Sequence, residues 1–461
     1  MSSGLVAAGL GASESVSSLG VAAAAAPSLP SAINPAVPDL PPTVKGMNDI
    51  LPPEVSKWQF VEEKARSVLE SFAYRELRTP ILEYTPLFVR SVGEDTEVVE
   101  KQMYTFTDRD GQSVSMRPEG TACAVRAYIA RSQWTREPVT RWYYLGPMFR
   151  HERAQRGRLR QFHQVGAEVF GLAAPSVDAE MIAMLVALLA DIGIKPSDLE
   201  VAINTLGEPE ERASYREALR GYFSNHLDKL DEGSRQRLQT NPLRILDSKD
   251  PDIQALAGDA PVLLDVLGDA SKQHFEAVRS HLSALGVQSV VDTKLVRGLD
   301  YYTGTIFEVK AKIGDLGAQN TLGGGGRYDR LVSSLGGPEV PAIGFGVGIE
   351  RVLLALAEPA EEFEPVLALF IAVLGDKAQA WALPVAHRLR LQGVRTEMEH
   401  RTASLKSQLK RADALKARLA LIVGDNELQS GKLVLRDLST RQQHEVTEAE
   451  LEGKIRELVD F

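Results

Sequence analysis

Cysteine is almost missing from this chain of 461 residues, in which Cys123 is the only one. One cysteine allows no disulfide within the chain and argues against a zinc site built on thiolates. Such scarcity is typical of a reducing compartment, so we expect a cytoplasmic location. Apolar runs of about 18 residues or more are absent as well, and the sequence therefore predicts no membrane span.

Positive charge is in short supply overall. The 52 Lys and Arg residues are outnumbered by 62 Asp and Glu, a formal net charge of −10, which argues against a nonspecific nucleic-acid coat. Yet the segment "FRHERAQRGRLRQFHQ" gathers five arginines: Arg150, Arg153, Arg156, Arg158 and Arg160. Guanidinium groups suit phosphate, so this segment is a candidate site for polyphosphate or nucleic acid. A solvated basic loop is the simpler alternative.

Residues 1–44 differ from the rest of the chain. They are rich in Ala, Ser and Pro, and Glu14 and Asp39 are their only charges. They fit neither a transit peptide, which is rich in Arg, nor a secretory signal, which begins with basic residues. This composition predicts a disordered low-complexity tail.

Hydrophobic periodicity divides the remainder into four parts. Residues 45–204 contain a helix over 58–72, a hairpin, an apolar helix from Ala179 to about Leu189, and the β-like runs "RWYYLGPMFR" and "QFHQVGAEVFG", which we expect to pair antiparallel. Residues 205–290 read as a helical insertion, after which the β-like pattern resumes over 291–360. Residues 365–461 alternate strands and helices, which predicts an α/β domain with a largely parallel sheet, where Pro384 kinks or starts a helix.

One face of the second β-like run carries candidate ligand contacts. Gln164, Gly166 and Glu168 share this face because strand side chains alternate. We expect Gly166 to leave an open space between the amide and the carboxylate, which could admit a small polar ligand. Arg150 ends the preceding run, where it could hold a phosphate.

Two glycine-rich segments follow later. "GFGVGIER" places Gly344, Gly346 and Gly348 at alternate positions before a helix, so another backbone or a flat ligand can approach one strand face. Tight packing of strand against helix is the alternative, and the segment is neither a P-loop nor a Rossmann fingerprint. "GGGG" at 323–326 is expected to form a turn and, with "RYDRL" beside it, to shape a pocket wall.

Two further segments carry polar side chains. "RPEGTA" puts Glu119 and Thr121 at a strand–helix junction, where capping of the helix competes with recognition of a ligand ammonium. "LVRGLDYYTGT" places Arg297 and two tyrosines between β-like segments. His151 and His163 form no convincing metal pair, and no metal site is predicted. From its residues alone the chain is a phosphate-handling α+β enzyme with an appended α/β module.

Five motifs in order resemble those of the histidyl-tRNA synthetases, a family of class II aminoacyl-tRNA synthetases, in their bacterial form. "KGMNDILPPE" resembles the family's opening, "RTPILE" its motif 1, "FRHERAQRGRLRQFHQVGAEVFG" its motif 2, "GFGVGIERVLLAL" its motif 3, and "LVRGLDYYTGTIFEV" the segment restricted to histidine enzymes. The resemblance, from Lys45 to the C-terminus, implies an antiparallel catalytic sheet with flanking helices, a helical insertion and a C-terminal α/β anticodon-binding domain.

The resemblance implies an activity and its residues. Histidine and ATP give histidyl-adenylate and pyrophosphate, with Mg²⁺ bridging the phosphates, and the histidyl group then passes to the 3′ end of histidine tRNA. Arg150, Arg297 and Arg351 match positions at the catalytic phosphates, and Glu152 matches one near adenine. The matches to histidine contacts are Glu119 and Thr121 for the ammonium, Gln164 for the substrate backbone, Glu168 and Tyr302 for the imidazole, and Tyr328 nearby. Arg153 and Gln155 match tRNA contacts, and motif 1, around Pro80, implies a homodimer.

Two rival readings come from the same superfamily. The regulatory subunit of ATP phosphoribosyltransferase is a noncatalytic paralogue that typically lacks the anticodon domain and loses motif residues. Arg150, Arg297, Arg351 and the last domain are all present here, which argues against it. A class II synthetase for proline, threonine or glycine is disfavoured by "LVRGLDYY" and Glu168. A purely structural RNA-binding protein fits least.

Overall fold

The computed structural model describes residues 41–93, 96–246, 248, 250–313, 316 and 320–459. Contacts divide the chain into two units, Met1–Val44 and Lys45–Phe461. The tail predicted to be disordered falls on the first unit, and its residues 1–40 lie outside the described residues. No helix in the described parts of the chain is long and apolar enough to cross a membrane.

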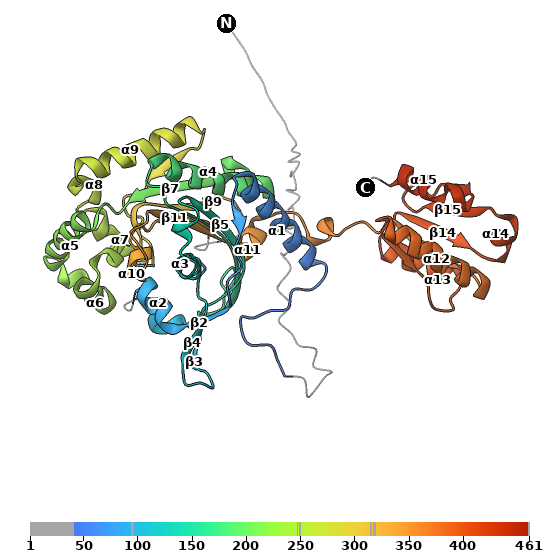
Figure 1. Ribbon diagram of the computed structural model, residues 1–461, viewed down its shortest axis with the longest axis horizontal. Helices are drawn as coiled ribbons and strands as arrows, with labels where there is room; N and C mark the ends of the chain where they lie inside the picture. The colour runs from blue at the N-terminus through green and yellow to red at the C-terminus, as the bar shows by residue number, and fades with distance from the viewer. Residues whose placement is uncertain are drawn as a thin grey trace, which may run out of the picture. The chain divides into compact units, whose positions relative to one another are not determined.

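An eight-stranded sheet forms the larger part of the second unit (Figure 1). Its strand order is β1-β5-β6-β11-β10-β9-β7-β8, and only β1 and β8, at the two edges, run parallel to their neighbours. The strands are β1 (Arg75–Glu76), β5 (Thr140–Phe149), β6 (Gln161–Phe170), β7 (Leu199–Thr205), β8 (Ser289–Val291), β9 (Thr303–Ala311), β10 (Thr321–Arg327) and β11 (Ala342–Gly348). The antiparallel pairing expected for the two runs around the arginine-rich segment is confirmed.

Alternation along β6 separates a core face from a polar face. Val165, Ala167 and Val169 point into the main hydrophobic core, together with helices α1 (Glu54–Ser71), α4 (Pro175–Ile192) and α9 (Asp269–Ala284). The opposite face bears Gln164, Gly166 and Glu168. These residues point away from that core because successive side chains of a strand alternate between its two faces. Helices α3 (Thr121–Ala130) and α10 (Leu331–Ser334) pack on this second face. In Figure 1, α4 and α9 lie above the sheet and α3 below it.

The "GGGG" segment is a strand, so the prediction of a turn at 323–326 is wrong. Gly325 pairs with Phe345 on one side and Phe307 on the other. A Cβ atom on Gly325 would lie 1.9 Å from the carbonyl oxygen of Gly344, and one on Gly324 would lie 2.7 Å from that of Phe307. The glycines are therefore needed because β9, β10 and β11 pack too closely for side chains.

The predicted hairpin is confirmed as β3 (Thr105–Thr107) and β4 (Ser113–Met116). It forms a three-stranded sheet with β2 (Leu82–Tyr84), and helix α2 (Thr85–Val92) follows that strand. The chain turns at Gly111, whose φ is +79°. Leu82, Tyr84 and Phe106 leave much of their side chains exposed on this small sheet.

The helical insertion has its own hydrophobic core, which spans residues from Tyr215 to Leu267. Its helices are α5 (Pro209–Ser224), α6 (Glu232–Thr240), α7 (Pro251–Gly258) and α8 (Leu263–Val266). The later helix α9 instead contributes Phe275, Val278 and Leu282 to the core of the large sheet. The independent core is therefore shorter than the interval 205–290.

The C-terminal part has a five-stranded sheet in the order β13-β12-β14-β15-β16. Its strands are β12 (Leu369–Val373), β13 (Thr396–Met398), β14 (Leu419–Val423), β15 (Leu433–Asp437) and β16 (Gln443–Val446), and its helices are α12 (Asp376–Leu391), α13 (Leu405–Ala414), α14 (Asp425–Ser430) and α15 (Glu448–Leu458). The first three neighbours are parallel as expected, whereas β15 and β16 are antiparallel. Pro384 lies inside α12 and does not start it.

Candidate active site

Glu168, on β6, is the centre of a buried hydrogen-bond network. Its side chain is fully buried. Its Oε1 atom accepts bonds from the hydroxyls of Thr121 (2.7 Å) and Tyr144 (3.1 Å), and its Oε2 atom accepts one from Tyr328 (2.5 Å). The three donors come from the start of α3, from β5, and from just beyond β10. A carboxylate with three hydroxyl partners is held in one orientation, as a recognition group must be.

Burial changes the charge state of this network. It raises the pKa of Glu168 to about 8, against the opposing effect of the hydroxyl donors. Burial and the neighbouring Glu168 charge likewise raise the pKa values of Tyr144 and Tyr328 well above that of a free phenol. In the ligand-free protein near neutral pH the carboxyl group is therefore mostly protonated. A cationic or N–H-donating ligand would favour its ionised form.

The prediction that Gly166 leaves an open space for a small polar ligand is wrong, because the ring of Tyr144 fills that space. The two residues face each other in the β5–β6 register. A Cβ atom on Gly166 would lie 2.2 Å from the ring of Tyr144, and one on Gly120 would lie 2.1 Å from it. The two glycines make room for this ring, which reaches Glu168. The sequence signal that could have identified Tyr144 is its place directly opposite a glycine.

The alternating glycines of β11 do open the face that Glu168 occupies. Gly344 pairs with Glu168, and a Cβ atom there would lie 1.7 Å from its Oε2 atom. A Cβ atom on Gly346 would lie 3.5 Å from the amide nitrogen of Gln164. A Cβ atom on Gly348 would meet no other atom within 4 Å. The spacing predicted that another backbone or a flat ligand can approach this face; the groups that lie against Gly344 are the Glu168 side chain and the backbone carbonyl of Ala167 on the paired strand.

Glu119 lies two residues before the first residue of helix α3 and caps the helix from there. Its buried carboxylate accepts bonds from the backbone N–H groups of Thr121 and Ala122, both at 2.8 Å. The capping interpretation is therefore confirmed. Each carboxylate oxygen has a further lone pair, so the arrangement still permits a ligand ammonium.

The two tyrosines expected near the substrate differ in their contacts. Tyr328 bonds directly to Glu168, and the adjacent Arg327 anchors it through a buried pair with Asp178 on α4 (2.6 Å). Tyr302 is also buried, but its ring packs 4.7 Å from that of Tyr301 and below the guanidinium of Arg297. The phenols bonded to Glu168 are thus Tyr144 and Tyr328.

Arginines from three segments gather at the other end of the same strands. Arg351, near the start of α11 (Ile349–Ala355), donates to the carbonyls of Gly157 (3.1 Å) and Thr321 (2.9 Å). Burial and the positive charges of Arg158 and Arg150 lower the pKa of Arg351. A guanidinium remains protonated even so. Like charges placed together at such a cost are typical of a site for an anion.

The remaining residues of the arginine-rich segment form a turn. Arg150 donates to the carbonyl of Pro118 (2.8 Å) and lies over the ring of Phe162. Glu152 pairs with Arg158 at 3.0 Å. The backbones of Gln155 and Arg158 bond to each other, and the side chains of Arg153 and Gln155 point into solvent as exposed groups. Only part of the arginine cluster is therefore available at the surface.

Arg297 lies in the segment before β9 and pairs with Glu308 (2.5 Å). Gly324 makes room for it, because a Cβ atom there would lie 3.1 Å from its Nη1 atom. Its Nε atom is buried and makes no hydrogen bond to another described residue.

The described ranges of the chain contain no group of three His, Cys, Asp or Glu side chains that could hold a metal ion. His163 contacts Glu350 at 3.2 Å, and the ring of His151 packs against Tyr104. The two histidines therefore contact different residues.

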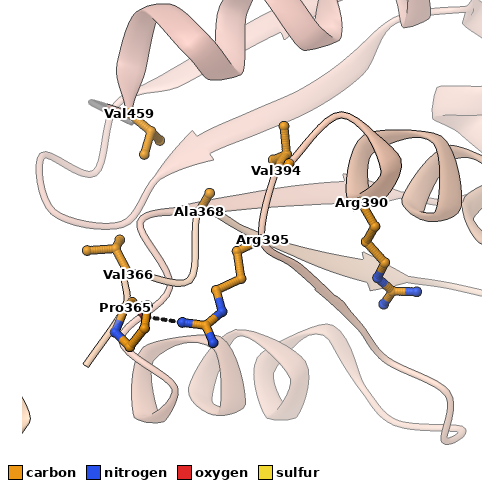
Figure 2. A pocket seen from close by; sticks show the side chains of 8 residues that line it. Pro365, Val366, Ala368, Arg390, Val394, Arg395 and Val459 are labelled. Atoms are coloured by element: carbon orange, nitrogen blue, oxygen red, sulfur yellow. Dashed lines mark hydrogen bonds between the residues drawn. The ribbon is translucent and has the colours of Figure 1, made fainter. Parts of the chain in front are cut away.

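A groove of about 600 Å³ lies in the C-terminal part, separate in sequence from all of these residues. Figure 2 shows Arg395 extended toward Pro365, to whose carbonyl it donates a hydrogen bond of 2.9 Å. Arg390 points elsewhere in the groove and donates to the carbonyl of Thr396. Val366, Ala368, Val394 and Val459 supply most of the remaining wall.

Comparison with known proteins assigns both parts of the chain. The family model described as histidyl-tRNA synthetase matches residues 46–352, and the one described as anticodon binding domain matches residues 368–458. A catalytic sheet followed by an anticodon-binding domain is the organisation of an aminoacyl-tRNA synthetase. The chain belongs to the histidyl-tRNA synthetase family.

Individual relatives agree with this assignment. The histidine–tRNA ligase of Sorangium cellulosum (strain So ce56) is 50% identical over 413 residues, which cover 90% of this chain and 95% of the relative. The apo crystal structure of S. aureus histidyl-tRNA synthetase is 35% identical, with a TM-score of 0.76 over 90% of this chain and 100% of that one. A Bacillus halodurans C protein titled ATP phosphoribosyltransferase regulatory subunit/histidyl-tRNA synthetase, 21% identical, has a TM-score of 0.60 over 83% of this chain and 97% of its own, and shares the fold.

Proposed function

We infer that this protein is a histidine–tRNA ligase, which activates histidine with ATP and transfers it to histidine tRNA. The observation that carries the inference is the pairing of two sites on neighbouring strands. A buried carboxylate, Glu168, lies on β6, and Arg150 and Arg351 lie beside the opposite end of β6 and β11. The first suits a polar ring and the second suits phosphate.

We propose that Glu168 accepts the ring N–H of histidine and that Tyr302 and Tyr328 border the ring. A polar pocket of this kind rejects apolar analogues, because its own buried groups would be left without partners. Gln164 is proposed to contact the substrate backbone, and Glu119 with Thr121 to receive its ammonium. The free lone pairs of the capping carboxylate support that role.

In the proposed first step, the carboxylate of histidine attacks the α-phosphate of ATP and pyrophosphate leaves. Arg150 and Arg297 are proposed to bind the α-phosphate, Arg351 to cover ATP from the other side, and Glu152 to lie near adenine. Negative charge grows on the phosphate oxygens in the transition state. Guanidinium groups already fixed by backbone contacts stabilise that charge without reorganising.

Mg²⁺ belongs to the proposal as a partner of ATP. Magnesium commonly keeps several waters and binds through substrate phosphates with few carboxylates. The ion would neutralise phosphate charge, and Glu152 and Glu308 are the carboxylates nearest the arginines.

The tRNA is proposed to meet the exposed Arg153 and Gln155 with its acceptor end and residues 365–461 with its anticodon. We also propose a homodimer through motif 1 and the neighbouring hairpin. Ile81, Leu82, Tyr84 and Phe106 are between 42% and 62% exposed there, and clustered exposed apolar residues mark interaction surfaces. The division at 45–204, 205–290, 291–360 and 365–461, and a cytoplasmic location, complete the proposal.

Aminoacylation tests the proposed function directly. The purified protein, ATP, Mg²⁺ and a bulk tRNA preparation are incubated with radiolabelled histidine, and acid-precipitable label is counted. Label on tRNA that is lost when histidine tRNA is removed from the mixture supports the proposal. Absence of charging by protein that is folded, as judged by circular dichroism, would contradict it.

A further inference from the structure

The segment before β9 carries both Arg297 and Tyr302, yet it contains no helix or strand from residue 292 to residue 302. Its geometry therefore depends on contacts with other elements. At its beginning, the buried amide of Asn204 on β7 donates to the carbonyls of Leu295 (3.0 Å) and Thr293 (3.4 Å). The sheet thus fixes the first part of the segment.

The helical insertion contacts the rest of the segment, where the backbone N–H of Asp300 also donates to the carbonyl of Val92 on α2 (3.2 Å). Arg212 on α5 donates to the backbone carbonyl of Tyr302 at 2.7 Å. Arg244 pairs with Asp300 at 3.3 Å, and Val296 packs against the hydrophobic core of the insertion. Three contacts along one segment therefore come from residues that the large sheet does not supply.

The Arg212 contact comes with an electrostatic cost. Burial lowers the pKa of Arg212, and the positive charges of Arg216 and Arg330 lower it further. Its resolved hydrogen bond goes to a neutral carbonyl, while Asp300 and Glu208 compensate the charge only from a distance. Arg212 thus differs from a surface arginine, which pairs with a carboxylate at little cost in free energy. It lies among like charges and donates its hydrogen bond to a backbone carbonyl.

We propose that Arg212 is a positioning residue for histidine binding: it holds Tyr302 in place from the helical insertion and so couples the insertion to the amino-acid site. The inference rests on the proposed function, because it takes Tyr302 to border the substrate ring. Coupling of this kind is reciprocal, so histidine in the site also stabilises the α5 contact.

The test is steady-state ATP–pyrophosphate exchange by Arg212→Met, with Arg220→Met as the matched control. Arg220 lies on the same helix and pairs with Glu217 at the surface. Loss of a charge-assisted bond to a buried carbonyl is expected to raise KM for histidine about tenfold or more. KM for ATP should stay within about twofold of wild type, as should both constants of Arg220→Met. Unchanged KM for histidine, or equal increases in both constants, would overturn the proposal.

Two further variants keep the test decisive. Arg212→Lys retains the charge but shortens the reach of the side chain. KM for histidine is therefore expected to rise less than in Arg212→Met, while KM for ATP is unchanged. If the methionine variant does not fold, a lysine variant with the same KM for histidine as the wild type would overturn the proposal. In a Tyr302→Phe background, Arg212→Met is expected to add less than its separate effect, because both changes weaken the proposed contact of the Tyr302 side chain with histidine: one removes its hydroxyl, and the other removes the bond that positions its backbone. Independent, multiplying effects would overturn it. Wild-type protein without any exchange would instead refute the proposed function.

Discussion

Replacing Glu168 with Gln tests whether the central carboxyl group is neutral in the ligand-free protein. The folded protein holds this group at a pKa of about 8 because it is buried, whereas in the unfolded chain its pKa is about 4.3. Between these values the folded state binds one proton more than the unfolded state. The free energy of unfolding must therefore fall as pH rises through this window.

The size of the effect follows from the window. One proton of difference changes the free energy of unfolding by about 1.4 kcal/mol per pH unit. Between about pH 6 and about pH 7.5 this group should cost the wild type about 2 kcal/mol of stability. Gln carries no titratable proton, and its amide presents an acceptor oxygen and an NH₂ donor group to the surrounding hydroxyls, where a protonated carboxyl group presents an acceptor oxygen and an O–H donor. The variant should lose this pH dependence and keep the fold.

Urea unfolding of both proteins without ligand, followed by tryptophan fluorescence at the two pH values, measures the difference. Subtracting the two proteins cancels every other titrating group, and Glu276→Gln, an exposed residue paired with Arg279, controls for a change of surface charge. The difference between the two proteins in the free energy of unfolding is expected to change by about 2 kcal/mol between the two pH values. Parallel behaviour of wild type and Glu168→Gln would refute the assignment of a raised pKa.

Three other substitutions probe the site. Arg297→Ala is expected to reduce ATP–pyrophosphate exchange by about a hundredfold or more while circular dichroism is unchanged, because Glu308 keeps partners in Thr321 and Lys310; exchange near wild type would exclude a role at the α-phosphate. Gly344→Ala places a methyl group 1.7 Å from the Glu168 carboxylate, so KM for histidine should rise by more than KM for ATP, measured in the same assay; equal values would show that Glu168 does not contact the substrate. Tyr144→Phe removes one of the three hydroxyl donors and should cost about 1 kcal/mol in thermal unfolding, and a loss near zero would mean that the bond is not formed.

The sequence predicted β5 and β6 of the large sheet because both have strong local signals. Alternation of apolar and polar side chains placed Gln164 and Glu168 on one face of β6, and the structure agrees. The glycines at 323–326 misled the prediction, since a run of glycine resembles a turn unless the two flanking strands are known. Which backbone presses on a glycine is a tertiary fact.

The candidate site was predictable as a set of residues but not as a set of contacts. The resemblance of its motifs to those of a known family identified Glu119, Glu168 and Tyr328, although only the fold shows that Tyr328 bonds to Glu168. Tyr144 was missed because its function depends on glycines in two other elements. Arg212 was missed for the same reason: its partner carbonyl lies 90 residues away in sequence.

The central claim is that this site activates histidine, and ATP–pyrophosphate exchange measured with each amino acid separately tests it most directly. The account predicts exchange with histidine and none above background with the other amino acids, because the buried polar network around Glu168 discriminates against side chains that cannot bond to it. Exchange with a different amino acid, or no exchange from folded protein, would contradict the account.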